Sequence, residues 1–398
     1  MGLVQDGPTN VQQSRHWWCL ALVLLGYVGY FKGSYLLAGM PVDATVTSAA
    51  AVVVGISVQI LKRAQYARVP LARILALFAA LAPGVAISGN LGKSLLLFTI
   101  TLACAVAPCY FLLEEKAQWS LLLTTVVAAI AMGVAAYAFP DVETQEFYGR
   151  LSLAGSDTIA TGRVIGAGVV VVVALSLFPS NWRLLLVALG VVGVGVMAAV
   201  GSRGPLMGMI AAVAGILLSS RGLKGIRVKA VGIGIALACI AVWIVSIMPT
   251  GGGARVVAFL AGNEDDDGRS RLAEKALALI PTHPFGLGWG GFASLGFLSG
   301  DRPLSYPHNL LLEVTLEGGW IACVAFILIA TLSMRGFISS SGSPAGIALL
   351  GLGIYWITVA QTSSDINGNR MTWVVLCTGL VLGSRNIAVS ESTPEAER

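Results

Sequence analysis

The sequence predicts an all-α polytopic membrane protein that forms a single integral membrane domain over residues 1–398. Hydrophobic residues make up 56% of the chain and charged residues only 11%, whereas soluble domains contain roughly 25% charged residues. The apolar runs have about the 20 residues that an α-helix needs to cross the hydrocarbon core. They lack the alternation of an outer-membrane barrel strand.

Apolar runs in chain order predict about twelve membrane-spanning helices. They lie at 17–37, 43–61, 71–89, 94–113, 119–139, 163–179, 183–200, 204–220, 229–248, 309–334, 344–362 and 371–385. Each run is predicted to be helical because backbone groups in hydrocarbon must find their hydrogen bonds within the segment. The polar stretch 249–308, between the ninth and tenth runs, predicts one large loop.

The basic residues predict the orientation. They stand singly at the edges of apolar runs, and a cytoplasmic N-terminus places more than half of the 25 Lys and Arg on the cytoplasmic side. The run from Trp17 is too long for a signal-peptide core, so it predicts an uncleaved span. Both termini are then cytoplasmic, with 386–398 as a disordered tail. The segments 140–162, 201–204 and 249–308 lie on the extracytoplasmic face.

Several functional classes are disfavoured. The chain has no Walker, Rossmann or HExxH motif and no repeat of 20–50 residues. Its scattered positive charge predicts no nucleic-acid partner. The acidic run Glu264–Asp267 lacks the ligand spacing of a cation site, and all six cysteines fall inside predicted spans, where they are expected to pack. No metal, disulfide or cofactor is therefore predicted.

Arginines at the outer ends of predicted spans are the first candidate site residues. Arg203 stands between two apolar runs, where a guanidinium is costly unless it meets an anion or a cavity, although a snorkelling arginine is the alternative. Its flanking glycines and Pro205 predict a fixed corner. Arg150 and Arg163 bracket a polar hairpin on the same face and are candidates for lining a shared substrate cavity.

The large loop contains a predicted amphipathic helix from Gly268. Its apolar stripe consists of Leu272, Ala276, Leu279 and Ile280. Arg269 shares the packed face of this helix, whereas Arg271 is predicted to face solvent, and both stay candidates for anion binding. His283 closes the helix before Pro284, and the glycines of 286–291 predict tight turns.

His308 is the candidate base. It precedes Asn309 and a long apolar helix, so it is expected at the outer edge of that span. A neutral imidazole can take a proton from a sugar hydroxyl, and a merely interfacial histidine is the alternative. Glu313 and Glu317 are expected to orient it or to satisfy polar contacts in the bundle. Arg370 follows a short outer loop, where it either pairs with Asp365 or lines the cavity rim.

Three motifs resemble the O-antigen ligase and O-antigen polymerase superfamily. They are GSRGPL at 201–206, HPFGLGWGGF at 283–292 and PHNLLLEVTLEGG at 307–319, and the order of elements agrees from about 150 to 380. Arg203 matches the family's span-boundary arginine, His308 its histidine, and Arg269 or Arg271 its loop arginine. The helix after the loop arginine lacks the family's frequent tryptophan, which leaves the choice between these two arginines open.

The resemblance implies a multi-pass glycosyltransferase of the bacterial cytoplasmic (inner) membrane, without nucleotide sugar or metal. Its expected substrates are an undecaprenyl-pyrophosphate-linked glycan and an acceptor glycan, and its expected partners are membrane lipids and other polysaccharide assembly proteins. Polymerisation of repeat units with inversion is the leading hypothesis. O-antigen ligation to lipid A core or another acceptor is the alternative, and a flippase, a transporter or a noncatalytic scaffold is the competing class.

Overall fold

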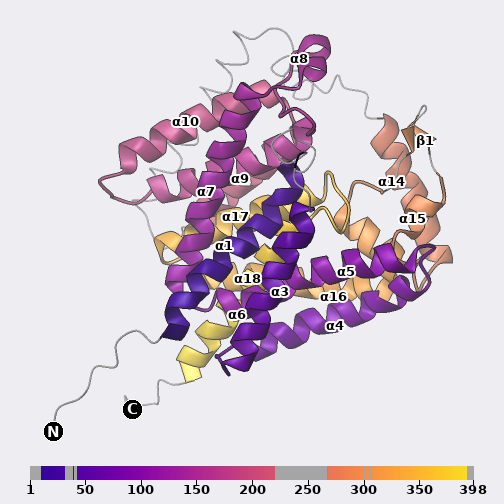
Figure 1. Ribbon diagram of the computed structural model, residues 1–398, viewed down its shortest axis with the longest axis horizontal. Coiled ribbons are helices and arrows are strands. Elements are labelled where there is room, and N and C mark those ends of the chain that lie inside the picture. Colours follow the sequence, from indigo (N-terminus) through magenta and orange to yellow (C-terminus); the bar gives the residue numbers. More distant parts are fainter. Residues whose placement is uncertain are drawn as a thin grey trace.

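The computed structural model describes residues 10–31, 39, 43–219, 267–296, 298–299, 302–303 and 306–391. Apart from a hairpin of two short strands, β1 Leu298–Ser299 and β2 Arg302–Pro303, its elements are helices (Figure 1). They are α1 Asn10–Phe31, α3 Ala44–Leu61, α4 Arg68–Ala86, α5 Leu91–Val106, α6 Pro108–Phe111, α7 Glu115–Ala138, α8 Val142–Tyr148, α9 Thr158–Ser176, α10 Arg183–Val200, α11 Arg203–Ser219, α14 Asp267–Leu279, a 3-10 turn Ile280–Thr282, α15 Gly291–Ser294, α16 Leu310–Ser340, α17 Pro344–Ala360 and α18 Arg370–Glu391.

The helical membrane class is confirmed, but the count of twelve spans is not. Within the described residues, seven helices are long and apolar enough to cross a membrane. Shorter apolar helices cover Trp17–Phe31, Arg203–Ser219 and Pro344–Ala360. Every predicted run except 229–248 falls on a helix, and 229–248 lies outside the described residues. α18 extends to Glu391, into the stretch predicted as a tail.

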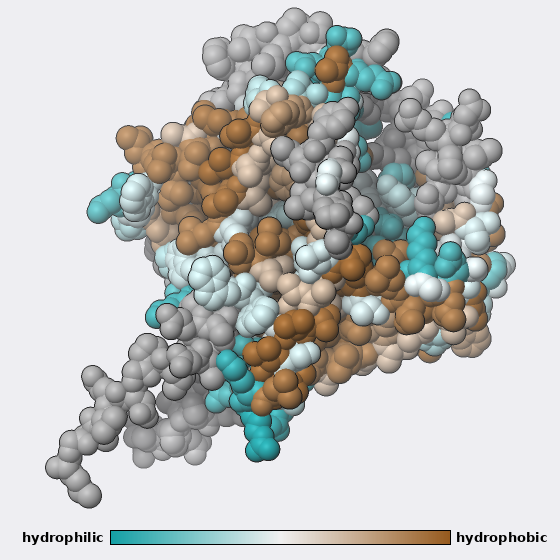
Figure 2. All heavy atoms as spheres, viewed as in Figure 1, coloured by the Kyte–Doolittle hydropathy of each residue, from teal (hydrophilic) through white to brown (hydrophobic). Residues whose placement is uncertain are grey.

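Apolar side chains cover the outside of this bundle. Figure 2 shows them over α10 and α7 and again over α3, α4 and α5, with polar side chains at the ends of the helices. Val127, Leu184 and Ile321 are among the exposed large hydrophobic residues. An apolar surface of this extent fits contact with lipid tails rather than with water.

The centre of the bundle is α9, of which 83% is buried, compared with 28% for α10. Glycines on α9 allow its neighbours to approach closely, as small residues do in membrane helices. A Cβ at Gly168 would collide with Ala129 of α7, and one at Gly166 would collide with the Tyr355 hydroxyl of α17. Tyr355 in turn donates to the Arg163 carbonyl at 2.9 Å. The core thus holds the first turns of α9 in a fixed place.

The described cysteines pack inside the bundle, as the sequence predicts. Cys19, Cys104, Cys109, Cys323 and Cys377 are buried, and the Sγ atoms of Cys109 and Cys377 lie 3.3 Å apart. Cys239 lies outside the described residues.

The long helix α16 is interrupted at Gly319, which the sequence analysis missed. Gly319 has φ 71° and ψ −171°, a conformation essentially confined to glycine. The loop 283–291 docks into this break: the Trp320 N–H donates to the Pro284 carbonyl at 3.0 Å, and the Leu287 N–H donates to the Leu316 carbonyl at 2.6 Å. Gly286 and Gly288 have positive φ in this loop, as the predicted tight turns require.

We expect Gly319→Ala to destabilise the protein by more than about 1–3 kcal/mol, the cost of a strained backbone conformation. An added Cβ would also collide with the Pro284 carbonyl oxygen. Thermal unfolding of the purified protein in detergent measures the effect. Gly133→Ala is the matched control, because a Cβ there meets nothing within 4 Å and Ala is the better helix former. Equal melting temperatures for the two variants would contradict this reading of the break.

A second small core holds α14 against α16 beside this break. It consists of Leu272, Ala276, Ile280, Phe292 and Leu316, with Leu279 packed on it. The predicted apolar stripe is therefore confirmed as the packed face of α14. Figure 1 shows α14, α15 and β1 gathered at one end of the molecule, toward which α4, α5 and α16 extend.

Candidate active site

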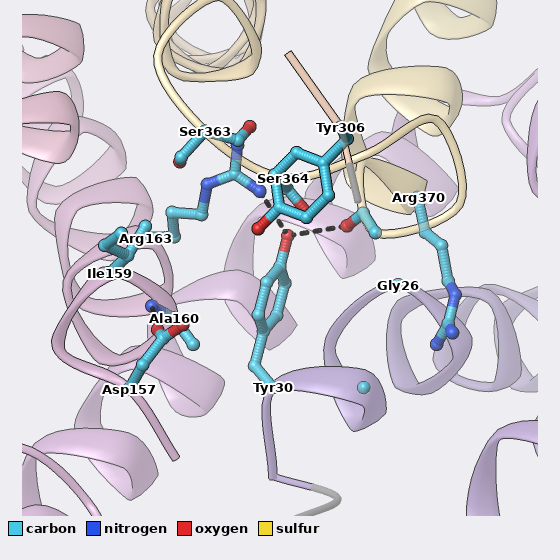
Figure 3. A pocket seen from close by; sticks show the side chains of 12 residues that line it. Gly26, Tyr30, Asp157, Ile159, Ala160, Arg163, Tyr306, Ser363, Ser364 and Arg370 are labelled. Atoms are coloured by element: carbon cyan, nitrogen blue, oxygen red, sulfur yellow. Dashed lines mark hydrogen bonds between the residues drawn. The ribbon is translucent and has the colours of Figure 1, made fainter. Parts of the chain in front are cut away.

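The candidate site forms where several helix ends meet the loop 361–369 between α17 and α18. Ser363 and Ser364 in this loop line a cavity of about 220 Å³ together with residues of α1, α9 and α18. We call it the tyrosine cavity, because Tyr30 and Tyr306 are in its wall (Figure 3). The residues of its wall are Gly26, Gly29, Tyr30, Asp157, Ile159, Ala160, Arg163, Tyr306, Ser363, Ser364, Gly368 and Arg370.

Arg163 is the innermost charge of the site, with only 1% of its surface exposed. Its Nη2 donates to the Val359 carbonyl at 3.1 Å, the Ser363 carbonyl at 2.6 Å and Asn369 Oδ1 at 3.0 Å. Its Nη1 donates to the Tyr30 hydroxyl at 3.3 Å. These four acceptors are neutral, so Arg163 ties α1, α17 and the loop 361–369 to α9. It borders the tyrosine cavity, but its Nη atoms are already engaged.

A smaller adjoining cavity of about 80 Å³, which we call the corner pocket, contains Arg150 and Arg203 in its wall. The other residues of its wall are Thr158, Ile159, Gly201, Ser202, Gly204, Thr362 and Ser363. It therefore shares Ile159 and Ser363 with the tyrosine cavity. The structure brings Arg150, Arg163, Arg203 and Arg370 around these two adjoining spaces.

Arg203 begins α11 directly after the corner that the sequence predicts. Gly201 caps α10 in the left-handed conformation, with φ 61°, and Arg150 donates to the Val200 and Gly201 carbonyls at 3.2 Å each. These bonds satisfy carbonyls left open at the end of α10. Arg150 also donates to Thr158 Oγ1 at 2.6 Å. Arg150 thus stabilises the turn between α10 and α11. Arg203 is half-buried and lies at the N-terminal end of α11.

Arg370 lines the tyrosine cavity from the start of α18. The predicted pair with Asp365 is not formed: Asp365 Oδ1 accepts from the Gly368 N–H at 2.6 Å, and Arg370 Nη1 donates to Thr45 Oγ1 at 3.4 Å. The aspartate is used to shape the loop. Arg370 itself lies in the wall of the tyrosine cavity, and its role there stays a prediction.

His308 lies just before the start of α16, as predicted, and its ring is next to that of Tyr306 in the wall of the tyrosine cavity. Its ring centroid is 4.4 Å from that of Tyr306, which lines the cavity. Burial raises the pKa of the Tyr306 hydroxyl, and nearby Asp365 and Asp157 raise it further. That hydroxyl therefore stays protonated at neutral pH and can donate. His308 has a positive φ of 58°, a conformation uncommon outside glycine.

The polar residues after His308 hold other segments rather than the cavity wall. Asn309 caps α16 through a bond from the Leu312 N–H at 3.0 Å and donates to the Gln361 carbonyl at 3.3 Å. Glu313 is buried and hydrogen-bonded to the backbone of Ile366. Both therefore fix the loop 361–369.

Glu317 accepts from the Gly290 N–H at 2.8 Å and so fastens the loop 283–291. His283 Nδ1 lies 2.9 Å from Thr282 Oγ1 and 3.1 Å from the Leu279 carbonyl, at the end of α14 where the sequence places it.

The loop arginines are placed only in part. Arg271 is exposed on α14 and lines neither cavity, which agrees with its predicted solvent-facing position. The side chain of Arg269 lies outside the described part of the structure, so the choice between the two arginines stays open.

Sequence reasoning missed several cavity residues. Tyr30 lies near the end of a span that reads as ordinary membrane helix, and Ser363 and Ser364 lie in a short loop without a motif. Asp157 accepts from the Ala160 N–H as the cap of α9. Of these four residues, only Asp157 carried a signal in the sequence, because an aspartate before an apolar run is typical of a helix cap.

The comparisons identify one family. A family model described as O-antigen ligase matches residues 188–327 of the 398, a range that includes Arg203, Arg271 and His308. The comparison with curated proteins finds no match. The matched family indicates glycan transfer in polysaccharide assembly, from a lipid-linked glycan to an acceptor glycan. The match to residues 188–327 supports the resemblance of this segment to the O-antigen ligase superfamily.

Proposed function

We propose that the protein transfers a glycan from undecaprenyl pyrophosphate to a hydroxyl of an acceptor glycan at the outer face of the bacterial cytoplasmic membrane. The observation that carries this proposal is the corner pocket, where Arg203 stands at the first turn of α11. Helix N-termini offer free N–H donors and a partial positive charge to anions. Arginine adds permanently charged, bidentate donors that need no metal.

The proposed reaction is a single displacement. The acceptor oxygen forms a bond to the anomeric carbon of the donor as the bond from that carbon to the pyrophosphate oxygen breaks. The hydroxyl proton passes to His308, and the pyrophosphate departs as an anion held by Arg203. One displacement inverts the anomeric configuration. His308 and Arg203 have different roles in this step. The general base His308 must reach the attacking hydroxyl, whereas Arg203 donates to the leaving group and stabilises the charge that develops there.

The orientation and the loop complete the proposal. We place both termini in the cytoplasm, so that the ends of α1, α10 and α17 and the starts of α9, α11, α16 and α18 lie on the outer side. The stretch 249–308 then stands on that side as an extracytoplasmic loop, with α14 carrying the loop arginine. Its packing on α16 supports a position beside the start of α16, where His308 lies.

Arg203→Ala is expected to lower turnover by about 10²–10³-fold, the usual effect of removing one donor from a developing anion. Arg203→Lys should recover part of the rate, since lysine keeps the charge but loses the bidentate geometry. The measurement is glycan transfer by purified protein supplied with undecaprenyl-pyrophosphate glycan and acceptor. Arg68→Ala is the control, because Arg68 is exposed and packs over Tyr66 away from the site. Wild-type turnover in Arg203→Ala would remove the basis of the proposal.

We further propose that the transferred glycan is a repeat unit, so that the protein is a polymerase. Mass spectrometry of the glycans in a deletion strain separates the possibilities. Single unpolymerised units on the lipid carrier are expected for a polymerase. Full-length chains that stay on the carrier would identify a ligase, and an unchanged set of glycans on the outer face would contradict both activities.

A further inference from the structure

Arg370 carries a positive charge that the described contacts leave without a carboxylate partner. Its Nη1 meets the neutral Thr45 hydroxyl at 3.4 Å, and its buried Nε has no hydrogen-bond acceptor. Gly29 of α1 leaves the space for the guanidinium, because a Cβ there would come within 2.8 Å of Arg370 Nη1. A charge at the end of a membrane helix is costly unless it meets an anion or a water-filled cavity.

The tyrosine cavity as a whole has an excess of positive charge. Arg163 and Arg370 line it from opposite sides, with Tyr30 and Tyr306 between them (Figure 3). Among the described residues of its wall, Asp157 is the one acid, and its Oδ1 already caps α9. The Nη atoms of Arg163 are bound by four neutral acceptors, although its buried Nε, like that of Arg370, has no acceptor. An entering anion can therefore pair with Arg370 while the hydrogen bonds of Arg163 that hold the fold stay intact.

The rest of the cavity wall suits a sugar ring. Tyrosine rings offer flat faces for the C–H groups of a sugar, and the hydroxyls of Tyr306 and Ser364 can bond to its oxygens. The volume of about 220 Å³ is below the roughly 300–1,000 Å³ of pockets for drug-sized ligands. The space therefore fits one monosaccharide rather than an oligosaccharide.

We infer that the tyrosine cavity binds the sugar attached to the pyrophosphate of the donor, and that it selects a sugar bearing a carboxylate, which pairs with Arg370. This inference rests on the proposed function, because the adjoining corner pocket is where that function places the pyrophosphate. The two cavities share Ile159 and Ser363, so one donor head group can occupy both. Arg370 is thus a specificity residue outside the matched family segment.

The test compares three synthetic ligands in binding to the purified protein in lipid nanodiscs. They are undecaprenyl pyrophosphate linked to glucuronic acid, the same lipid linked to glucose, and undecaprenyl pyrophosphate alone. The wild-type protein should bind the glucuronate donor about 10- to 100-fold more tightly than the glucose donor, as expected for hydrogen bonds to a charged group. Arg370→Gln should abolish this preference, and Arg370→Lys should keep part of it. Arg73→Gln, at the far end of the membrane domain in the proposed orientation, should leave the preference unchanged.

The outcomes separate this inference from the proposed function. Equal affinity of the wild-type protein for both glycan donors would overturn the carboxylate selection, and this comparison needs no variant to fold. A full preference in Arg370→Gln would overturn the assignment to Arg370. If either of these results is obtained while undecaprenyl pyrophosphate alone still binds, the proposed pyrophosphate site is retained and only the carboxylate selection by Arg370 is rejected. If none of the three lipids binds, the proposed function fails and the inference with it.

Discussion

Replacing His308 by asparagine is expected to lower turnover by roughly 10²–10⁴-fold, the usual contribution of a general base. Asparagine is the informative substitution because His308 has φ 58°, and asparagine tolerates this left-handed conformation better than most residues. An alanine variant would combine loss of the imidazole with backbone strain. Because His308 contacts the Tyr306 ring at 4.4 Å and lines neither cavity, donor affinity should change little.

The measurement is single-turnover transfer from a saturating lipid-linked donor, which separates chemistry from binding. A second variant, His308→Gly, keeps the backbone and leaves a space that added imidazole can fill, so exogenous imidazole should restore part of its rate. His283→Asn is the matched control, since His283 contacts Thr282 and the Leu279 carbonyl at the end of α14. A His308→Asn enzyme that turns over at the wild-type rate would exclude His308 as the base.

The positions of the helices were predictable because the membrane leaves the chain few choices. An apolar run long enough to span must be helical to satisfy its own backbone, and the described helices accordingly fall on the predicted runs. The corner before Arg203 was predictable for a local reason as well. Gly201 in the left-handed conformation ends α10, and glycine is the residue that favours this backbone geometry.

The break in α16 was not predictable from hydropathy. Gly318 and Gly319 sit within one predicted span, directly after Glu317, and a glycine pair in a membrane helix more often serves close packing. The break exists because the loop 283–291 supplies partners for the freed backbone groups, as the bond from the Trp320 N–H to the Pro284 carbonyl shows. That loop is distant in sequence, so no local pattern records the contact.

The same limit applies to the tyrosine cavity. Its wall joins Tyr30 near the N-terminus to Arg370 near the C-terminus. Periodicity predicts which face of one helix is apolar, but it does not predict which two helices pack together. The charged residues of the site were therefore predictable as candidates. Their hydrogen-bond partners were not, nor was the distinction between arginines that hold the fold and arginines that face a cavity.

Arg163→Met is expected to lower the free energy of unfolding by about 2 kcal/mol or more. The methionine removes a buried charge, which returns part of its desolvation cost. It also leaves the Ser363 carbonyl and Asn369 Oδ1 without the donor they now share, whereas the Val359 carbonyl keeps its bonds from the Thr362 N–H and hydroxyl. Each buried acceptor left unsatisfied costs roughly 1–3 kcal/mol. Two such losses exceed the recovered desolvation, because the guanidinium is already solvated by these neutral acceptors.

Thermal unfolding in detergent should therefore show a fall of several degrees or more for Arg163→Met, on the order expected for a loss of this size. Arg183→Met is the matched control: Arg183 is half-buried and donates from Nε to the Ser176 carbonyl at 3.2 Å, at the other end of α9. If Arg163 also positions the site, its loss should affect donor binding as well as stability. Because Arg163 ties the loop 361–369 to α9, and Ser363 of that loop lines both cavities, donor binding should weaken at temperatures where the variant is still folded. A variant that is less stable but binds the donor as tightly as the wild type would show that Arg163 supports the bundle alone.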